Sequence, residues 1–538
     1  MQQPVWWQRG VIYQIYPRSF KDSNGDGIGD LRGVIEKLDY LRDLGIDAIW
    51  VSPFYPSPMV DFGYDISDFT AVDPMFGTLA DFDELVEGAH ARDIRVIVDF
   101  VPNHTSDQHA WFIESRSSRD NPKRDWYFWR DAKPDGNLPN NWLSVFGNVA
   151  WEWDEKTRQY YLHTFLKEQP DLNWRNPEVK AAMFDVLRFW LDRHVDGFRL
   201  DAVHYIMKHP DLPDNPPNPT RGSGFKPLGD YDSLLHVHDM AHDDIHGIFR
   251  EFRALLNSYS TERPRFSIGE IHMQDWGKWA SYYGANLDEL HMPFNFSFMF
   301  APWEVRAMQA VIDNLETHIP AGAWPNFVLG NHDEHRIASR VGRERAPAAM
   351  MLLLTLRGTP TIYYGDELGM EDVEIPPELQ QDPWGKNVAG FGLGRDPERT
   401  PMQWDASPNA GFCAKDIPPW LPLSPDYALV NVETQLRDPR SMLMLTRRLL
   451  ALRRATPALN VGAYRAVPHD TCLVFGREDG HDRWLVAINL TDEQTIVQIP
   501  EHGSGQIVIS TKLDREEMVK LDALILRSHE GCIIHLTS

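Results

Sequence analysis

Eight short apolar segments recur along the chain, and each of them ends in polar or charged residues. Their lengths fit strands, and they are nearly continuous in hydrophobic residues rather than alternating. Strands that are apolar on both faces are typical of a parallel sheet that is covered on both sides. The segments are residues 11–16, 48–53, 96–101, 197–201, 266–270, 290–294, 327–333 and 361–365.

Helical patterns lie between these strands. In residues 30–44, apolar positions recur every three or four residues, with Asp30 placed to cap the start and Gly45 the end. Residues 78–91 repeat the pattern, and a further helix begins at Asn176, with Pro177 at its first position. Strands alternating with helices in this way predict an α/β fold, a TIM (β/α)8 barrel.

Two parts of the chain depart from this alternation. Residues 105–171 are rich in Trp, Asn, Asp and Pro and are too long for an ordinary loop, so we expect a small inserted domain over the barrel mouth. After residue 460, short strands joined by turn residues predict an all-β domain. The expected division is a barrel of residues 1–104 and 172–460, the insertion of residues 105–171, and a C-terminal β-sandwich of residues 461–538.

Composition restricts the possible partners and the compartment. The chain has 538 residues, with 53 Lys and Arg against 78 Asp and Glu, and this acidic balance disfavours nucleic acid and anionic membranes. Cys413, Cys472 and Cys532 are few and far apart, so no disulfide framework is expected. We find no signal peptide and no bilayer-spanning apolar run, and therefore expect a cytoplasmic protein without a membrane partner.

Charged residues gather at the ends of the predicted strands, where a TIM barrel carries its active site. Arg199 and Asp201 lie two apart on one strand and face the same way. Arginine lowers the proton affinity of a nearby carboxylate, which suits Asp201 as a nucleophile, whereas Glu270 beside ionised carboxylates should hold its proton as a general acid. A purely structural Arg–Asp ion pair is the alternative, but Asp99 and the pair His332-Asp333 end two further strands.

The loop after the first strand has the pattern of a hard-cation site. Oxygen donors alternate with glycines from Asp22 to Asp30, which suits Ca²⁺ or Mg²⁺ in a structural role. The loop lacks the bidentate glutamate of an EF-hand, so it is not one. The alternative is a polar turn in which Asp30 only caps the following helix. We see no nucleotide-binding motif and expect no organic cofactor.

Four segments together resemble glycoside hydrolase family 13, the α-amylase family, over nearly the whole chain. They are residues 99–104 (DFVPNH), 197–201 (GFRLD), 267–270 (SIGE) and 327–333 (FVLGNHD). Residues 169–173 (QPDLN) resemble the signature of the oligo-1,6-glucosidase-like subfamily. The resemblance implies that Asp201 is the nucleophile, Glu270 the general acid/base, and Asp333 a third carboxylate that stabilises the transition state.

The resemblance also implies a closed pocket for one glucose unit and a Ca²⁺ site. The residues that would hold the non-reducing glucose are Asp61, Tyr64, His104, Arg199, His332 and Arg399. The pocket wall and the next subsite would be shaped by Phe146, Phe165 and Gln169. The ion would be held by Asp22, Asn24, Asp26, the backbone carbonyl of Ile28, and Asp30.

The residue after the nucleophile bears on linkage. In the subfamily, valine there goes with α-1,6 bonds and smaller residues go with α-1,4 bonds; here it is Ala202. We therefore expect a retaining, exo-acting α-glucosidase for short substrates such as maltose, which passes glucose to water or to a hydroxyl acceptor, and which is a monomer or homodimer. The alternatives are a sucrose- or trehalose-type isomerase, an α-1,6-glucosidase, an endo-amylase, and a non-catalytic amylase-like interaction module.

Overall fold

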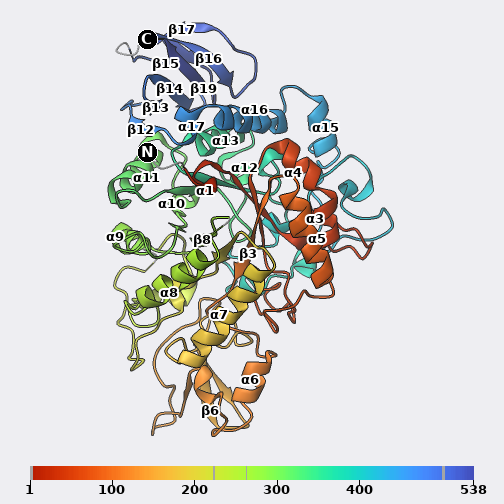
Figure 1. The fold of residues 1–538 in the computed structure, drawn as a ribbon, viewed down its shortest axis with the longest axis vertical. Coiled ribbons are helices and arrows are strands. Elements are labelled where there is room, and N and C mark those ends of the chain that lie inside the picture. Colours follow the sequence, from red (N-terminus) through yellow and green to blue (C-terminus); the bar gives the residue numbers. More distant parts are fainter. Residues whose placement is uncertain (1–3, 222–223, 262, 500–502, 538) are drawn as a thin grey trace.

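The computed structural model describes residues 4–221, 224–261, 263–499 and 503–537. Eight parallel strands form one sheet in the order β10-β11-β1-β2-β3-β7-β8-β9 (Figure 1). They are β1 (Ile12–Ile15), β2 (Ala48–Val51), β3 (Arg95–Phe100), β7 (Gly197–Leu200), β8 (Phe266–Gly269), β9 (Met292–Pro293), β10 (Asn326–Val328) and β11 (Thr359–Tyr363). All eight predicted strands are present, so the predicted barrel is confirmed.

One side chain spans the gap between the two terminal strands of this sheet. The backbone N–H of Asn295, after β9, donates to Oδ1 of Asn326 in β10 at 3.1 Å. The Asn326 amide nitrogen in turn donates to the carbonyl of Pro293. Proline in β9 cannot donate to a ladder, so a side-chain amide takes the place of backbone pairing and nearly closes the barrel.

The helices surround the sheet. The first predicted helix is split at Lys37 into α3 (Leu31–Glu36) and α4 (Leu38–Leu44), but Asp30 caps its start through Gly33 N–H and Gly45 ends it in a left-handed conformation. The other helices of the barrel before its last strand, β11, are α1 (Trp6–Arg9), α2 (Pro17–Phe20), α5 (Leu79–His90), α7 (Pro177–Asp192), α8 (Ile245–Ser258), α9 (Trp276–Ser281), α10 (Ser297–Phe300), α11 (Val305–His318), α12 (Ile337–Val341) and α13 (Ala346–Thr355).

The segment between β3 and α7 forms a lobe at the opposite end of the molecule from the C-terminal strands (Figure 1). It contains α6 (Ala110–Ser115) and the sheet of β4 (Trp129–Arg130), β6 (Gln159–Leu162) and β5 (Trp151–Asp154). A buried ion pair fixes its return to the barrel, because Lys208 Nζ lies 2.7 Å from Asp171 Oδ2 and 2.8 Å from Asn103 Oδ1. The exact limits of the inserted domain stay a prediction.

The C-terminal part is all-β, as predicted. Its main sheet is antiparallel, in the order β12-β13-β14-β19-β16-β17, and a two-stranded layer, β15 with β18, packs on one face. These strands are β12 (Ala463–Ala466), β13 (Cys472–Asp479), β14 (Asp482–Asn489), β15 (Thr495–Val497), β16 (Ser504–Ser510), β17 (Met518–Lys520), β18 (Leu524–Leu526) and β19 (Gly531–Thr537). The helices α15 (Val432–Arg437), α16 (Met442–Ala455) and α17 (Pro457–Asn460) precede them.

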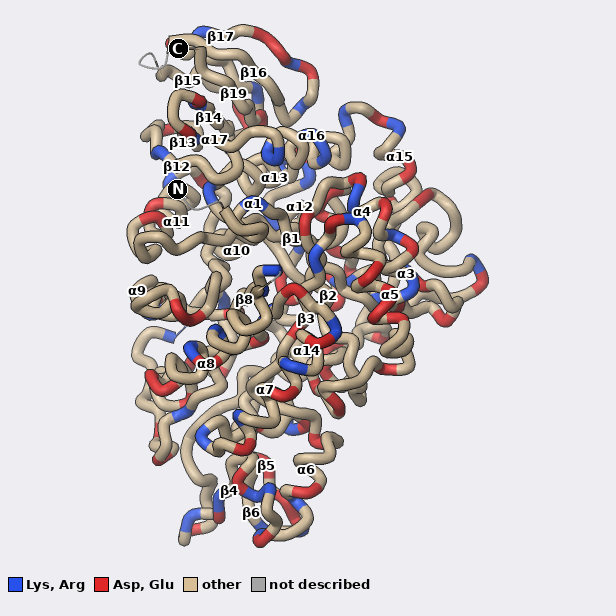
Figure 2. Tube along the Cα trace, in the orientation of Figure 1, with Lys and Arg blue, Asp and Glu red and all other residues tan. Residues whose placement is uncertain are grey.

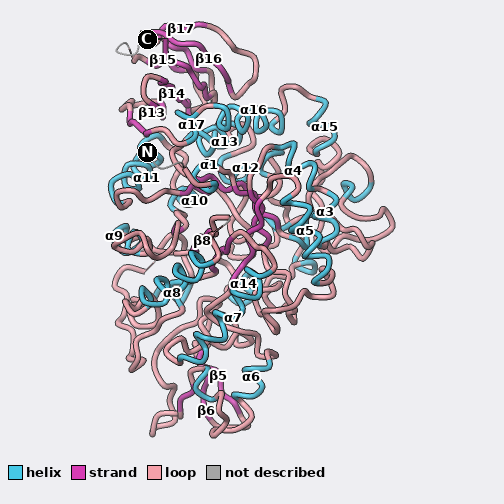
Figure 3. Tube along the Cα trace, in the orientation of Figure 1, coloured by secondary structure: helices cyan, strands magenta, loops and turns pink. Residues whose placement is uncertain are grey.

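Loops occupy much of the barrel mouth (Figure 3), including the long segment that carries α14 (Pro383–Asn387). Acidic and basic residues are interspersed along the whole trace (Figure 2). All three cysteines are free, and all three are buried. In the described parts of the chain, we find no helix with the length and apolar character needed to cross a membrane.

Candidate active site

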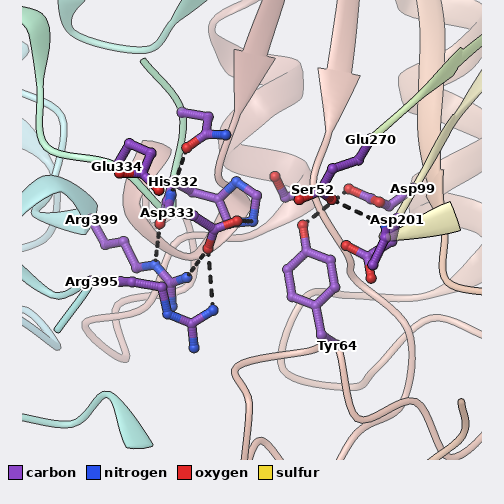
Figure 4. A network of polar contacts seen from close by, with 12 residues as sticks. Ser52, Tyr64, Asp99, Asp201, Glu270, His332, Asp333, Glu334, Arg395 and Arg399 are labelled. Atoms are coloured by element: carbon purple, nitrogen blue, oxygen red, sulfur yellow. Dashed lines mark hydrogen bonds and ion pairs between the residues drawn. The ribbon is translucent and has the colours of Figure 1, made fainter. Parts of the chain in front are cut away.

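Arg199 organises the carboxylates at the ends of β3, β7 and β8. The guanidinium is fully buried, and its Nη1 lies 2.6 Å from Asp99 Oδ1 and 2.7 Å from Asp201 Oδ1. Its Nη2 contacts Glu270 Oε2. One cation therefore orients three carboxyl groups that come from three different strands. Figure 4 shows the side chains of Asp99, Asp201 and Glu270 close together.

Aromatic groups hold this arrangement from behind. The Arg199 guanidinium lies 4.9 Å from the ring centre of Trp50, whose indole N–H donates to Asp99 Oδ2 at 2.9 Å. The Tyr64 hydroxyl also donates to Asp99 Oδ2, at 3.2 Å. Burial raises the pKa of Asp99 to about 6, because the charge of Arg199 only partly offsets the loss of solvent.

The pKa values of Asp201 and Glu270 are shifted in the opposite directions to those that we expected. Burial raises the pKa of Asp201 well above the aspartate range, against the opposing charge of Arg199 and with the negative charge of Glu270 adding to the rise. Burial acts on Glu270 too, but Arg199 and His272 lower its pKa below the glutamate range. The expected order of the two pKa values is wrong for the sugar-free site, because His272 Nε2 lies 2.6 Å from Glu270 Oε1 and Asp201 has no such contact.

Asp333 lies across the mouth from this group, beside two arginines (Figure 4). Its Oδ1 is 2.8 Å from Arg399 Nη2 and 3.2 Å from Arg395 Nη1. Burial opposes ionisation of Asp333, but His332 and both arginines hold its pKa below the usual range. Arg399 also donates through Nε to the carbonyl of His332 at 2.6 Å, which fixes the loop that carries Asp333.

Arg395 closes one side of the site. Its Nη2 is 2.6 Å from Asp61 Oδ1 and 2.7 Å from Asp382 Oδ1, so one guanidinium joins Asp61, Asp382 and Asp333. Gln169 donates to the other oxygen of Asp61 at 3.0 Å. The bridge brings together residues that are far apart in the chain, and it leaves little freedom at this wall.

Neutral histidines complete the polar wall. His104 is fully buried against the carbonyl of Tyr64, at 3.1 Å from Nε2, and burial lowers its pKa to about 4. The His332 ring is stacked on Tyr64 with ring centres 5.3 Å apart and planes 8° apart. Burial also lowers the pKa of His332 to about 3, so both imidazoles are uncharged near neutral pH, and His332 Nε2, which has no hydrogen-bond partner among the described residues, can donate to a sugar hydroxyl.

An aromatic wall faces the polar one. Phe146 stacks on Trp384 at 4.9 Å, and the Arg395 guanidinium lies 5.1 Å from the Phe146 ring centre. Phe165 contacts the rings of His104 and Tyr205 at 5.3 and 5.5 Å. Flat apolar faces of this kind are suited to packing against the carbon face of a sugar ring.

Ala202 holds a strained position between the nucleophile candidate and this wall. Its φ of 42° and ψ of 39° place a non-glycine residue in the left-handed region. Its N–H donates to Glu270 Oε2 at 3.2 Å, so the unusual backbone contributes a donor to the carboxylate pair. Backbone strain of this kind is found at functional sites that the surrounding structure fixes.

The predicted residues surround one cavity of about 410 Å³, a volume typical of a small-ligand site. It is lined by Asp61, Tyr64, His104, Phe165, Asp201, Ala202, Glu270 and Asp333. The other predicted residues, which do not line it, are Phe146, Gln169, Arg199, His332 and Arg399, and each of them contacts a lining residue. The outer part of the cavity is largely apolar, with Phe225, Leu228, Leu235, Met240 and Phe300.

The predicted cation loop lies outside this cavity. Asp22 and Asp30 are buried, and their carboxylates accept N–H groups of the loop itself, Gly27 at 2.9 Å and Ser23 at 2.9 Å. A Cβ on Gly27 would lie 2.3 Å from the carbonyl of Pro418, so only glycine fits there. The donor set is entirely oxygen, which is the ligand type that hard cations such as Ca²⁺ prefer.

Sequence reasoning missed several residues of the site, above all Arg395. Asp382, Trp384, Tyr205 and His272 were missed as well, and all except Asp382 line the cavity. A signal was available for Arg395, because it lies four residues before the predicted site residue Arg399. For the others no periodicity or spacing marks the residue, since they lie in loops or in short helical turns.

Comparisons with known proteins agree with this geometry. The profile of the α-amylase catalytic domain matches residues 14–462. A probable alpha-glucosidase from Rhizobium meliloti (strain 1021) is 43% identical over 535 residues, which cover 96% of each chain. An oligo-1,6-glucosidase from Parageobacillus thermoglucosidasius is 39% identical over 568 residues, covering 98% of each. The solved structure of the alpha-glucosyl transfer enzyme XgtA is 41% identical, with a TM-score of 0.94, over 99% of this chain and 100% of that one.

Proposed function

Since the chain belongs to the α-amylase family, glycoside hydrolase family 13, and is an enzyme of the glycosidase or glucosyl-transferase type, we propose that it releases or transfers the terminal α-glucose of short substrates such as maltose. The observation that carries this proposal is the bridge of Arg395 to Asp61 and Asp333, beside Asp201 and Glu270. A wall at that place leaves room for a sugar at a chain end and not for the middle of a polysaccharide.

The proposed reaction has two displacement steps with Asp201 as nucleophile. A carboxylate oxygen of Asp201 attacks the anomeric carbon while the glycosidic bond breaks, and Glu270 gives its proton to the departing oxygen. In the second step an acceptor hydroxyl gives its proton to Glu270 and attacks the same carbon, which releases Asp201. Two inversions give net retention, so the product is an α-glucoside or α-glucose.

The protonation of the sugar-free site implies a proton shift when substrate binds. The pKa of Asp201 is raised and that of Glu270 is lowered, so Asp201 holds a proton more tightly than Glu270 does before substrate binds. Asp201 and Glu270 both contact Arg199, so a small movement of the guanidinium strengthens its contact with one carboxyl and weakens its contact with the other. We propose that a bound sugar displaces His272 from Glu270 and thereby moves the proton to the acid.

The electrostatics around the anomeric carbon suit a transition state with positive charge. Asp333 stays ionised beside the pocket because Arg395 and Arg399 pair with its Oδ1. Its Oδ2 lies 3.4 Å from the neutral His332 ring and is open to the cavity side. Fixed negative charge in a water-poor pocket stabilises an oxocarbenium-like transition state strongly.

The apolar outer cavity supports transfer as well as hydrolysis. Phe225, Leu228 and Phe300 line the same cavity as the catalytic carboxyls. Such a surface holds an acceptor by its carbon face and holds few ordered waters, which lowers the local competition from hydrolysis. The linkage preference for α-1,4 bonds is part of the proposal and rests on the small side chain of Ala202 in the cavity wall.

We also propose that Ca²⁺ binds the loop from Asp22 to Asp30, with Mg²⁺ as the alternative ion. Asp22, Asn24, Asp26, Asp30 and the carbonyl of Ile28 would supply its oxygen ligands. The carbonyl of Gly27 accepts the backbone N–H of Trp420 at 3.0 Å, so the loop packs against the segment after Pro418. An ion there would stabilise the fold rather than join the chemistry. The cytoplasmic location and the oligomeric state stay predictions.

A proton NMR time course with maltose tests the proposal. We expect α-glucose to form before mutarotation and, with glycerol present, an α-glucosyl glycerol. Early β-glucose would contradict the covalent role of Asp201. Faster turnover of isomaltose would favour an α-1,6-glucosidase, and rearrangement of sucrose without release would favour an isomerase.

Two variants complete this test. Asp201→Asn should lower kcat by at least about 10³-fold, since it removes the nucleophile. Asp185→Asn is the matched control, because that carboxylate is 76% exposed and pairs only with Arg188 on the same helix. Equal activity of the Asp201 variant and the control would refute the proposed mechanism.

A further inference from the structure

Three ligand-type side chains meet just outside the active-site cavity. His335 follows Asp333 by two residues, Glu398 precedes Arg399, and Asp372 follows the last barrel strand. One ligand atom of each lies within 4.8 Å of the other two. His335 Nδ1 is 2.8 Å from Asp372 Oδ2 and 3.8 Å from Glu398 Oε2. In the described chain this is the one group of its kind formed by His, Cys, Asp and Glu.

The Glu398 side chain is the independent sign that this is a site. Glu398 is 1% exposed, and among the described residues its Oε2 has no hydrogen-bond partner. This is the same oxygen that points toward His335 Nδ1. A buried carboxylate oxygen without a donor is costly, and a bound cation is one of the few groups that compensate it.

The other acid is oriented in advance. Asp372 Oδ1 accepts the backbone N–H of Arg336 at 2.9 Å, and the Asp372 N–H donates to Ser339 Oγ at 2.7 Å. Oδ2 is thereby turned toward His335. Hydrogen bonds of this kind to ligating carboxylates are typical of metal sites, where they fix the direction of the ligand oxygen.

We propose that His335, Asp372 and Glu398 bind a divalent transition-metal ion of the Zn²⁺ type. One imidazole nitrogen and two carboxylate oxygens form a ligand set that such ions accept, with water at the remaining positions. Ligand atoms at about 2.0–2.2 Å from a common ion lie roughly 3–3.5 Å apart. The observed 2.8 and 3.8 Å bracket that range for the two pairs that include His335, and the third pair lies within 4.8 Å.

The ion would tie together three segments that build the mouth of the pocket. None of its ligands lines the cavity, so it does not touch the substrate. Its two neighbours in sequence do act there, since Asp333 and Arg399 form the pair at 2.8 Å. The bound ion would therefore fix the positions of Asp333 and Arg399 relative to each other. The His335 side chain is 47% exposed, which gives the ion a path of entry.

Calorimetric titration with Zn²⁺ tests the proposal on the full chain. Metal is first removed with a chelator, and Ca²⁺ is then added in excess so that the proposed Asp22–Asp30 loop is filled. We expect one equivalent of Zn²⁺ to bind, Co²⁺ to give visible absorption bands at the same stoichiometry, and Zn²⁺ to raise Tm by a few degrees. His335→Gln and Glu398→Gln should each weaken binding by at least about 10-fold.

The control variant is His535→Gln. This histidine has the same exposure, 47%, and also faces a single aspartate, Asp482 at 3.0 Å, but it has no third ligand. Binding that is equally weakened in the control, or that survives in both site variants with unchanged affinity, overturns the proposal. Absence of any Zn²⁺ and Co²⁺ binding to the parent overturns it too. His335 is half exposed, so its variant is expected to fold and the result can be interpreted.

Discussion

Replacing Arg395 by methionine should damage both the fold and the pocket. The side chain keeps its length and loses its charge, which leaves Asp61 and Asp382 without their cation although they are 4% and 2% exposed. The Asp333 contact, at 3.2 Å and with 20% of that side chain exposed, should count for less. Removing one partner of a buried pair costs about 3–5 kcal/mol, since it leaves an uncompensated charge.

The loss should appear in two separate assays. Thermal unfolding should show a Tm several degrees lower, because two buried carboxylates must be protonated or hydrated. The kcat/KM for maltose should fall by about 10- to 150-fold, the equivalent of losing one charge-assisted contact worth about 1.5–3 kcal/mol in the pocket wall. Arg395→Lys should recover little, since a single ammonium does not span three carboxylates as a planar guanidinium does.

A double-mutant cycle isolates the pair with Asp382. Burial opposes ionisation of Asp382, and Arg395 is the first of the charges that lower its pKa. Asp382→Asn removes this charge, so the double variant should be less destabilised than the sum of the single variants. Arg437→Met is the matched control, because that arginine is 73% exposed and pairs only with Glu433. An R395M protein with the Tm and kcat/KM of this control would refute the reasoning.

Three further outcomes are expected. Burial raises the pKa of Asp366 to about 7, so in the folded protein this carboxyl loses its proton only as the pH rises through 7. The Asp366→Asn variant should match the parent in stability near pH 4 and exceed it by up to about 4 kcal/mol above pH 7. Equal Tm curves for the two proteins across that pH range would contradict this. Chelation should lower Tm, with Ca²⁺ restoring it more than Mg²⁺, and Asp26→Asn should abolish the response; an unchanged response would remove the ion from the loop. Ala202→Val should lower the ratio of kcat/KM for maltose to that for isomaltose by about 10-fold or more, whereas a constant ratio would detach linkage choice from this position.

The barrel and the ends of its strands were predictable for a physical reason. A strand that is buried on both faces must be apolar along its length, so a charged residue at its end is conspicuous, as for Asp201 and Glu270. Strand limits were less certain where the chain bends away to present a side chain. Residues 329–333 were expected in a strand, but β10 stops at Val328, which lets His332 and Asp333 turn toward the pocket.

Two strands of the C-terminal part carry no such signal in the sequence. β12 and β17 are short edge strands whose residues are largely exposed, so they carry no apolar pattern. Arg395 was not predicted from the sequence for a third reason. Its partner Asp61 lies 334 residues away in the chain, and neither lies in a regular element, so only the tertiary structure brings them together.

The protonation of the catalytic pair could not be inferred from composition, because it depends on which nitrogen of one arginine faces which carboxylate. Nη1 of Arg199 is shared between Asp99, Asp201 and the Tyr64 hydroxyl, whereas Nη2 faces Glu270. Asp201 therefore shares its arginine nitrogen with two other groups, whereas Glu270 does not share Nη2. The same geometry suggests how substrate reverses the order: a sugar oxygen that takes the place of His272 removes the second donor from Glu270, and the pair is then poised for acid catalysis.

The site separates two groups of charge that must not share protons. Arg199 gathers Asp99, Asp201 and Glu270 on one side, and Arg395 with Arg399 gathers Asp333 on the other (Figure 4). Between them lie the stacked rings of Tyr64 and His332, both of which are uncharged near neutral pH, because burial raises the pKa of the first and lowers that of the second. Asp333 is held ionised by its own pair of arginines, whose charges help to keep its pKa below the usual range. The reacting pair can therefore change protonation at each step while Asp333 remains an anion throughout, which is the charge that a transition state with a positive sugar ring requires.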